Sequence, residues 1–409
     1  MRKIFNSIDI GTYEIKIATI EHYNGKYNVL AKTSVPSQGL DAGTIINQSQ
    51  VASQLKKAIK NIESKLGTKI DKSLAIIPSD NLNITIATSK INLAEDKPIT
   101  GEIIFSCLQK MLKGNIEKGM EAVNVFPIEY NLDNKKVNIP HGQTGKVLEI
   151  KGIVLTVPKE NIYKTVSIIE SLGIEVIDIA LSSFSNYYAT KNKEIDTKVT
   201  SVIDIGEEKT IVSIFNKGII IKENILPIGT KKIEENILFN YKLDEKNIKK
   251  IKENFATANR KYSDSEDIYI VKDRNNLEIK INQYAISEIV EKNIVDILKK
   301  AKNEINNLTN REIGYIIITG GITNLLGFNA LVEDLFIKNA GIINLGTIGM
   351  RNNKYSAVYG SVKYFVDKLN LREKEFNMFK DENIDEMLAT RKKIGSSNVL
   401  GRIFDKFFD

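Results

Sequence analysis

Cysteine, histidine and long apolar runs are scarce in this chain, and each scarcity excludes a class of protein. Its single cysteine, Cys107, rules out an internal disulfide and fits a reducing compartment. Cys107 falls in an apolar series around Phe105, so we expect it in a core and not as a catalytic nucleophile. The two histidines, His22 and His141, together with one cysteine offer no metal-binding constellation.

No run of about 20 apolar residues is present, so no transmembrane helix is expected. Asp9 and Glu14 come too early for a signal peptide, and we expect the chain to stay in the cytoplasm. The formal net charge is +7, but the lysines are spread along the sequence and few aromatic residues alternate with them. This pattern argues against a nucleic-acid partner and is compatible with an anionic membrane surface or an acidic protein.

Two strand–turn–strand units of the same form lie about half a chain apart. The first has strands at 4–10 and 15–20 around an Asp-Ile-Gly-Thr turn. The second has a strand at 200–206 that ends in Asp-Ile-Gly and continues into a strand at 210–215. We interpret the pair as an internal repeat.

The segment 84–158 has its own succession of expected strands and a helix. It combines a strand at 84–93, a helix at 102–118 and strands at 123–132 and 148–156, so we interpret it as an inserted α+β subdomain. The other expected elements are strands at 27–32, 73–77, 174–179, 218–226 and 313–319, and helices at 51–66, 166–172, 182–189, 232–240, 245–258 and 284–306.

The glycine turns carry the chemistry of a phosphate site. An Asp-x-Gly-Thr hairpin turn presents backbone N–H groups and a hydroxyl to an anion, and its carboxylate can hold Mg²⁺ through water. One such turn is more often an ordinary turn, but two of them with a Thr-Gly-Gly turn after a buried strand predict a nucleotide site. Lys16 lies on the strand that follows the first turn, where its side chain could reach a bound phosphate. The alternative is that Lys16 is an ordinary exposed lysine of that strand.

The last residues, 397–409, form an amphipathic helix pattern after a charge-dense stretch. Its apolar stripe is Val399, Leu400, Ile403, Phe404, Phe407 and Phe408. The stripe can dock on the protein's own body or lie in a membrane surface, where the basic residues 391–393 would meet anionic lipids. We favour the membrane.

Together these features resemble the actin/Hsp70/sugar-kinase ATPase superfamily and, more narrowly, the FtsA family of bacterial cell-division proteins. The motifs that carry the resemblance are Ser-Ile-Asp-Ile-Gly-Thr at 7–12, Val-Pro-Ser-Gln-Gly-Leu-Asp-Ala-Gly at 35–43, Ser-Val-Ile-Asp-Ile-Gly at 201–206, Ile-Leu-Pro-Ile-Gly at 225–229, Thr-Gly-Gly at 319–321 and the terminal helix. The resemblance covers essentially the whole chain. It implies an α/β, actin-like two-lobe ATPase fold with an inserted α+β subdomain and a C-terminal amphipathic membrane helix.

The resemblance also implies a division into subdomains. These are 1-83 with 159-198 and 355-372 (subdomain 1A), 84-158 (inserted subdomain 1C), 199-230 with 309-354 (2A), 231-308 (2B), 373-395 (flexible linker) and 396-409 (membrane-targeting helix).

By the same resemblance, the chain would bind ATP or ADP with Mg²⁺, polymerise on the cytoplasmic face of the membrane at the division site and tether FtsZ filaments there. The implied nucleotide-binding residues are Asp9, Gly11, Thr12, Lys16, Asp204, Gly206, Thr210, Gly229, Gly320 and Gly321, with Asp9 and Asp204 also holding the metal. The implied FtsZ-tail residues are Glu288, Glu291 and Lys292, and residues 84–158 would contact other divisome proteins and neighbouring copies.

The second turn departs from the family's glycine-rich pattern, because Glu207 and Glu208 follow Gly206. Two carboxylates near the phosphates predict weak nucleotide binding or slow hydrolysis, unless Mg²⁺ or Lys209 compensates their charge. We therefore expect at most a weak ATPase in which nucleotide acts as a conformational ligand. One alternative is a PilM-like protein of type IV pilus assembly, which would not need the terminal helix. Another is a soluble ATPase or kinase of the same superfamily; an MreB-like protein lacks a comparable insert.

Overall fold

The computed structural model describes residues 2–93, 97–113, 115–275, 277–336, 339–371 and 374–380. It divides into two compact units, Met1–Ile77 with Thr165–Asp409 as unit 1 and Pro78–Lys164 as unit 2. The terminal stripe Val399, Leu400, Ile403, Phe404, Phe407 and Phe408 lies outside the described residues. Among the described helices, none combines the length and the apolar character needed to cross a membrane.

The first half of unit 1 is built on a five-stranded sheet with the order β11-β6-β1-β2-β3. Its strands are β1 (Lys3–Ile10), β2 (Glu14–Tyr23), β3 (Lys26–Pro36), β6 (Lys72–Ile77) and β11 (Glu175–Leu181). Helix α1 (Gln48–Leu66) packs on β2 and β3, while α3 (Lys159–Glu170) precedes β11. A two-stranded pair, β4 (Leu40–Asp41) and β5 (Thr44–Ile45), lies in the loop before α1.

The second half of unit 1 is built on a second five-stranded sheet, β14-β13-β12-β17-β18. Its strands are β12 (Val199–Ile205), β13 (Thr210–Asn216), β14 (Ile219–Leu226), β17 (Tyr315–Thr319) and β18 (Ala340–Ile342). Read from β18, the sheet has the same arrangement as the first: two parallel pairings followed by two antiparallel ones. The internal repeat predicted from the Asp-Ile-Gly turns is confirmed by this shared topology.

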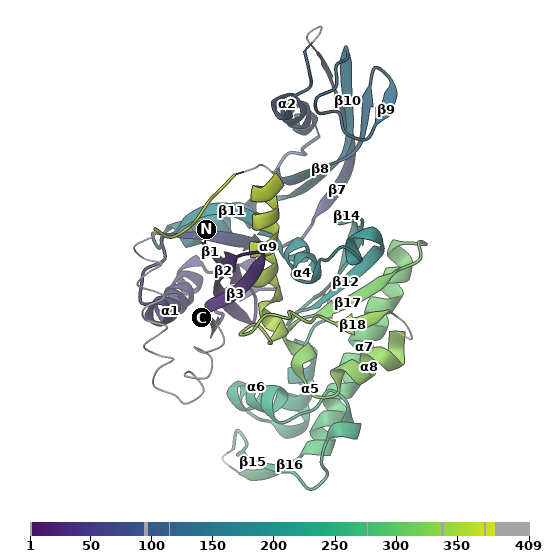
Figure 1. Cartoon of the computed structure of the whole chain (residues 1–409). Helices are drawn as coiled ribbons and strands as arrows, with labels where there is room; N and C mark the ends of the chain where they lie inside the picture. Colours follow the sequence, from purple (N-terminus) through teal and green to yellow (C-terminus); the bar gives the residue numbers. More distant parts are fainter. Residues whose placement is uncertain are drawn as a thin grey trace. The chain divides into compact units, whose positions relative to one another are not determined.

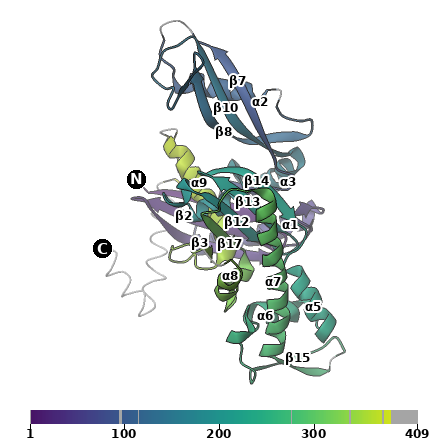
Figure 2. The same ribbon diagram turned by 90° about the vertical axis from the view of Figure 1, so that its right-hand side faces the viewer.

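Helices complete the second half around an aliphatic core. Helix α7 (Gln283–Leu308) packs on β13 and β14 and extends to α5 and β16, as Figure 2 shows. Its buried positions 286, 290, 294, 297, 301 and 305 recur at helical spacing. The remaining elements are α5 (Lys231–Tyr241), α6 (Glu245–Asn254), the hairpin β15 (Ile268–Lys272) with β16 (Glu278–Asn282), the 3₁₀ turn η3 (Gly321–Asn324) and α8 (Phe328–Phe336).

Two helices, α4 (Ser182–Thr190) and α9 (Ser356–Leu371), cross each other in unit 1 (Figure 1). Gly360 lies at the crossing: a Cβ there would stand 1.7 Å from the carbonyl oxygen of Ser185. Only glycine permits this backbone approach. Because α4 also contacts β12 and α9 also contacts β1, the crossing links the two sheets.

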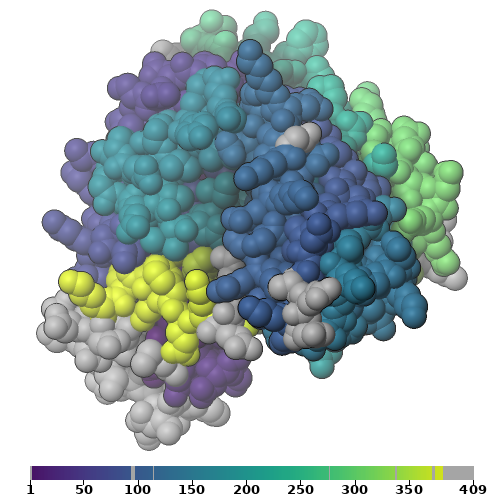
Figure 3. All heavy atoms as spheres, turned by 90° about the horizontal axis from the view of Figure 1, so that it is seen from above, coloured from purple at the N-terminus to yellow at the C-terminus, as the bar shows by residue number. Residues whose placement is uncertain are grey.

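Unit 2 contains a four-stranded sheet, β7-β10-β8-β9, on which helix α2 (Gly101–Leu112) packs. Its strands are β7 (Asn83–Asn92), β8 (Met120–Leu132), β9 (Lys135–Val137) and β10 (Val147–Pro158), and part of its surface is drawn in blue in Figure 3. Cys107 is fully buried in its core with Met111, which confirms the expectation that it is a core residue. The unit contains the segment 84–158 that we expect as an insertion; the subdomain boundaries stay a prediction.

Residues 374–380, the start of the expected flexible linker, pack on β1 instead of lying in solvent. The Met378 amide donates to the Ile4 carbonyl at 3.1 Å, and the Ile4 amide donates to Asn377 Oδ1 at 2.9 Å. Met378 and Phe379 are both buried. Sequence reasoning missed these two apolar side chains because the expected linker is rich in charged residues. Met378 and Phe379 pack on the sheet because burial removes their apolar surface from water.

Candidate functional site: two glycine turns around a buried lysine

The first glycine turn joins β1 to β2. The strands pair with Asp9 opposite Lys16, and the Gly11 amide closes the turn by donating to the Glu14 carbonyl at 3.2 Å. Lys16 Nζ donates to Asp9 Oδ2 at 2.6 Å, with both side chains only about one-sixth exposed (16% and 15%). A Cβ on Gly11 would stand 3.3 Å from Lys16 Nζ, so glycine leaves room for the ammonium.

Charge around Lys16 decides its protonation. Burial lowers the pKa of Lys16, but the carboxylates of Asp9, Glu14 and Asp204 outweigh burial and raise the pKa above its ordinary value. Lys16 is therefore a fixed cation. The alternative that we left open, an exposed strand lysine, is excluded by its burial.

The second glycine turn begins at Asp204, the penultimate residue of β12. Burial raises the pKa of Asp204, the nearby charge of Asp9 adds to the rise, and Lys16 opposes it. Asn186 Nδ2 of α4 donates to Asp204 Oδ2 at 2.8 Å. The two predicted carboxylates thus act on one lysine from two different sheets.

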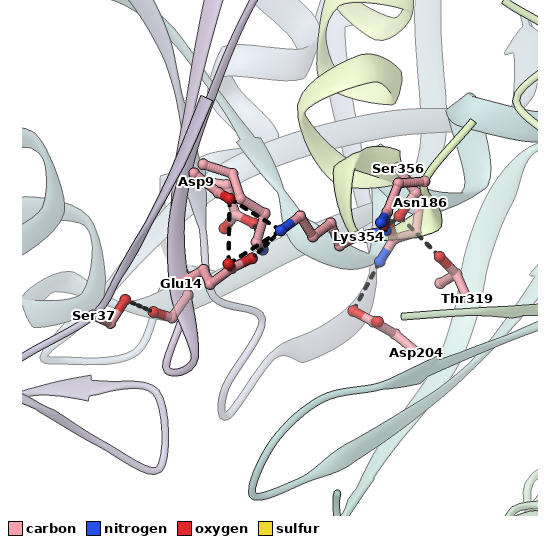
Figure 4. A network of polar contacts seen from close by, with 12 residues as sticks. Asp9, Glu14, Ser37, Asn186, Asp204, Thr319, Lys354 and Ser356 are labelled. Atoms are coloured by element: carbon pink, nitrogen blue, oxygen red, sulfur yellow. Dashed lines mark hydrogen bonds and ion pairs between the residues drawn. The ribbon is translucent and has the colours of Figure 1, made fainter. Parts of the chain in front are cut away.

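A chain of buried hydrogen bonds connects the second turn to the third. Ser356 Oγ donates to Asn186 Oδ1 at 2.7 Å, and Thr319 Oγ1 donates to Ser356 Oγ at 2.8 Å (Figure 4). Thr319 pairs directly with Asp204 in the sheet, so the end of β17 lies beside the end of β12.

The Gly320–Gly321 turn follows Thr319. Gly320 has φ +113°, and a Cβ on it would stand 2.2 Å from the Ile205 carbonyl oxygen, so no other residue fits. A Cβ on Gly321 would meet only Lys354 Cβ, at 3.7 Å. The first glycine is fixed by packing, whereas the second leaves open space at the start of η3.

Gly206, Thr210 and Gly229 hold the second turn together. The Gly206 amide donates to the Lys209 carbonyl at 3.0 Å, and Thr210 Oγ1 donates to the Ile228 carbonyl at 2.7 Å. A Cβ on Gly229 would stand 2.3 Å from the Glu207 carbonyl oxygen. These contacts give the three predicted residues a structural role in shaping the turn.

Glu208 differs from its expected arrangement. Its carboxylate accepts a hydrogen bond from the Ala42 amide and pairs with Lys231 Nζ at 2.5 Å. The negative charge of Glu208 is thus paired with Lys231, and its predicted effect on nucleotide binding stays a prediction. Burial, followed by the charge of Glu234, raises the pKa of Glu207, so its ionised form is disfavoured.

Several site residues escape sequence reasoning. Lys354 Nζ lies 2.7 Å from Glu14 Oε2 and donates to Ser34 Oγ at 3.0 Å. Glu14 was within reach of prediction, because it directly follows the first turn. Lys354, like Asn186 and Ser356 above, carries no local signal, since its partner lies 340 positions away in the sequence.

The predicted partner-binding residues lie on α7. Glu288 Oε1 accepts a hydrogen bond from Arg260 Nη1 at 2.5 Å, and Glu291 Oε2 accepts one from the Arg260 amide at 2.7 Å. Lys292 is exposed on the same helix. The two acidic residues therefore fix Arg260, which the sequence did not single out.

The predicted metal residues, Asp9 and Asp204, are held by Lys16 and Asn186. Within the described part of the chain, no group of three or more His, Cys, Asp or Glu side chains is arranged to hold a metal ion. A metal at this site would therefore need ligands from a bound molecule or water.

Known proteins of this architecture are actin-like. A chain of a PilM–PilN type IV pilus biogenesis complex superposes with a TM-score of 0.59 at 14% identity, covering 91% of this chain and 99% of that one. MreB5 of Spiroplasma citri bound to ADP gives a TM-score of 0.52 at 13% identity, with 90% and 98% covered. The predicted α/β actin-like fold is confirmed.

Sequence comparison narrows the class to a family. The sequence model of the family described as Cell division protein FtsA matches residues 201–360, and that of Type IV pilus assembly protein PilM matches residues 7–265. The FtsA of Bacillus subtilis is 22% identical over 366 residues, covering 88% of this chain and 83% of that protein. The FtsA of Streptococcus pneumoniae is 24% identical over 357 residues, covering 87% and 78%.

The PilM model matches more than half of the chain, so the chain belongs to the family described as Type IV pilus assembly protein PilM. Its predicted resemblance to FtsA is confirmed by the FtsA model and the curated relatives.

Proposed function

We propose that the chain is a cell-division protein that binds ATP or ADP with Mg²⁺ between its glycine turns and assembles on the cytoplasmic face of the membrane at the division site. There it would tether FtsZ filaments and contact other divisome proteins through residues 84–158. The single observation that carries the proposal is the convergence of Asp9, Lys16, Asp204 and the Thr319–Gly320 turn in a chain whose curated relatives are named cell division protein FtsA.

The residues of the site suit a metal-bound nucleotide better than a free one. Lys16 supplies one cation, but Asp9 and Asp204 oppose it with two carboxyl groups. A bare phosphate chain would be repelled by Asp9, and by Asp204 whenever it ionises, whereas Mg²⁺ would favour the ionised carboxyl groups and neutralise the phosphates. Lys16 would hold the phosphates, Gly11 and Gly320 would admit them by lacking a Cβ, and Gly321 would leave room for the nucleoside.

Calorimetric titration of the full chain with Mg-ATP, and with ATP in excess EDTA, tests this part. We expect binding of Mg-ATP and at least about tenfold weaker binding without the metal. Absence of binding in both titrations would reject the nucleotide site, and equal binding would reject the charge argument.

The tether to FtsZ is tested on α7. Lys292→Glu reverses an exposed charge beside Glu288 and Glu291, and the matched control is Lys299→Glu, exposed on the same helix. We expect the first variant to weaken binding of an FtsZ C-terminal tail peptide at least about tenfold and the second to leave binding unchanged. Equal affinities would remove α7 from the interface.

The membrane contact is proposed for the residues beyond 395. Flotation with anionic liposomes compares the full chain with a chain that ends at Gly395. We expect flotation of the full chain only; flotation of both chains would show that the apolar stripe is not the anchor.

A PilM-like role is the second candidate, because the PilM sequence model matches more of the chain than the FtsA model does. The PilM structure is titled as a complex with PilN, so a PilN peptide is the discriminating probe. Binding of PilN and not of the FtsZ tail would favour the pilus role.

A further inference from the structure

The loop between β4 and β5 is held by the second glycine turn at a single residue, Ala42. The Ala42 amide donates to Glu208 Oε2, and its carbonyl accepts a hydrogen bond from Lys209 Nζ at 3.2 Å. Both backbone groups of one residue in the first half of unit 1 are thus bound by consecutive residues of the second half.

Ala42 and Gly43 form the two-residue turn of the β4–β5 hairpin, which places both residues at positive φ. Ala42 has φ +45°, in the left-handed region that alanine rarely adopts. Such strain persists where surrounding contacts over-determine it. Lys231 Nζ, 2.5 Å from Glu208 Oε1, fixes the carboxylate that holds the Ala42 amide.

Tyr13 forms a second, independent contact between the halves. It follows Gly11 and Thr12 in the first turn, and its hydroxyl donates to Glu253 Oε1 of α6. Lys249 Nζ and Lys252 Nζ each lie 4.7 Å from the centre of its ring, within the range of a cation–π contact.

We propose that these two contacts form a clasp, Ala42 with Glu208 and Lys209 on one side and Tyr13 with Glu253 on the other, that closes the two halves of unit 1 without any nucleotide. Tyr13 is two residues past Gly11, and Glu208 is two residues past Gly206. Separation of the glycine turns must therefore break the clasp. Resting on the proposed nucleotide function, the clasp also limits how fast nucleotide enters and leaves.

This clasp gives the acidic second turn a function other than repelling phosphate. Glu208 is the ligand of the strained loop, and hydrogen bonds to a charged group are stronger than neutral ones. Loss of one such bond shifts an opening equilibrium by about tenfold.

Hydrogen–deuterium exchange of the ligand-free full chain tests the closure. In Glu208→Ala we expect amides of residues 37–47 to exchange at least about tenfold faster, and in Tyr13→Phe we expect the same for residues 248–256. The matched controls are Glu235→Ala, an exposed acid on α5, and Tyr163→Phe, an exposed tyrosine, and both should exchange as the unaltered chain does. Exchange in β12 and β17 reports whether each variant is folded.

Unchanged exchange of residues 37–47 in a folded Glu208→Ala variant would overturn the clasp. If that variant does not fold, Glu208→Gln replaces it: the amide oxygen still accepts from Ala42 but loses the Lys231 charge, so exchange should rise by less. No rise in either variant counts against the proposal.

Release of a fluorescent ATP analogue tests the second part. The double variant Tyr13→Phe/Glu208→Ala should release the analogue at least about tenfold faster than the unaltered chain. If the unaltered chain binds no nucleotide, the proposed function fails while the exchange experiment still decides the clasp. If it binds and the double variant releases at the same rate, the clasp does not gate exchange.

Discussion

Replacement of Lys16 by methionine removes the largely buried lysine that pairs with Asp9 and keeps a side chain of similar length. Lys16 and Asp9 are 2.6 Å apart, with 16% and 15% of their side chains exposed. Removal of one partner from a buried pair leaves an uncompensated charge and costs roughly 3–5 kcal/mol. Because some exposure remains, we expect Lys16→Met to lower the free energy of unfolding of unit 1 by about 3 kcal/mol.

An exposed pair supplies the matched control. Lys300 and Asp296 on α7 are 2.8 Å apart, but 52% of each side chain is exposed. Exposed helical pairs contribute roughly 0.3–0.5 kcal/mol, so Lys300→Met should cost less than a fifth of the Lys16→Met effect. Urea unfolding followed by circular dichroism measures both variants, and the double variant Lys16→Met/Asp9→Asn should recover most of the loss.

The pH dependence has a definite sign. The charge of Lys16 is the largest of the effects that oppose the rise in the pKa of Asp204, so in the variant that pKa rises further above its unfolded value. A carboxyl group with a raised folded pKa stabilises the fold at low pH and loses this contribution as pH increases. The deficit of Lys16→Met should therefore be larger at pH 8 than at pH 5.5.

Equal losses in Lys16→Met and Lys300→Met would refute the reasoning, because buried and exposed pairs would then be equivalent. A deficit that grows on acidification would refute the inference that the charge of Lys16 also favours the ionised form of Asp204.

Three further outcomes follow from single positions. Gly360→Ala should cost about 3 kcal/mol by forcing α4 from α9, while Gly341→Ala, whose Cβ meets no described atom within 4 Å, should leave the melting temperature within about 2 °C. Lys242→Gly should stabilise the chain by about 0.5–1 kcal/mol in chemical denaturation, because Lys242 ends α5 at φ +51°. Burial lowers the pKa of Lys363 to about 8, so between pH 8 and 10.5 the unfolded chain binds more protons there and unfolding free energy should rise with pH. In Lys363→Met that rise should be absent from otherwise identical titrations.

Local periodicity made the hairpins and the long helix predictable. The strands of both Asp-Ile-Gly units and α7 were assigned within a few residues, because each has a sustained pattern of one period. The helix expected at 245–258 ends at Asn254, where the Phe255 and Ala256 amides both donate to the Ile251 carbonyl. That irregular end depends on backbone geometry and leaves no trace in apolar spacing.

Two other elements, α9 and the hairpin β15–β16, were not predicted from the sequence. We assigned no helix to α9. Gly360 in its interior lowers helix propensity, and its lack of a Cβ permits the close approach of α4. The hairpin β15–β16 was also missed. Ile268 and Ile270 of β15 are exposed, so its apolar positions do not mark a buried face.

The residues of the candidate site also fall into two groups, those predictable from a local motif and those brought together only by the tertiary structure. Asp9, Lys16 and Asp204 were predictable because each follows from a short turn motif and its flanking strand. Asn186 and Ser356, which bind each other across 170 positions, were not, because they meet only through the α4–α9 crossing. Glu208 was predicted as a charge but not as a ligand of Ala42, since the sequence does not show which loops meet.

The two sheets share one topology, but their turns do not share one chemistry. In the first hairpin Asp9 is paired across the strands with Lys16, whereas in the second Asp204 is paired with Ile211. The charge of Lys16 therefore acts on both aspartates, and Lys209 adds a smaller effect on Asp204. If nucleotide binds as we propose, the missing positive charge has to arrive with the ligand, which is the physical reason to expect Mg²⁺ dependence from a site that lacks a preformed metal cluster among its described residues.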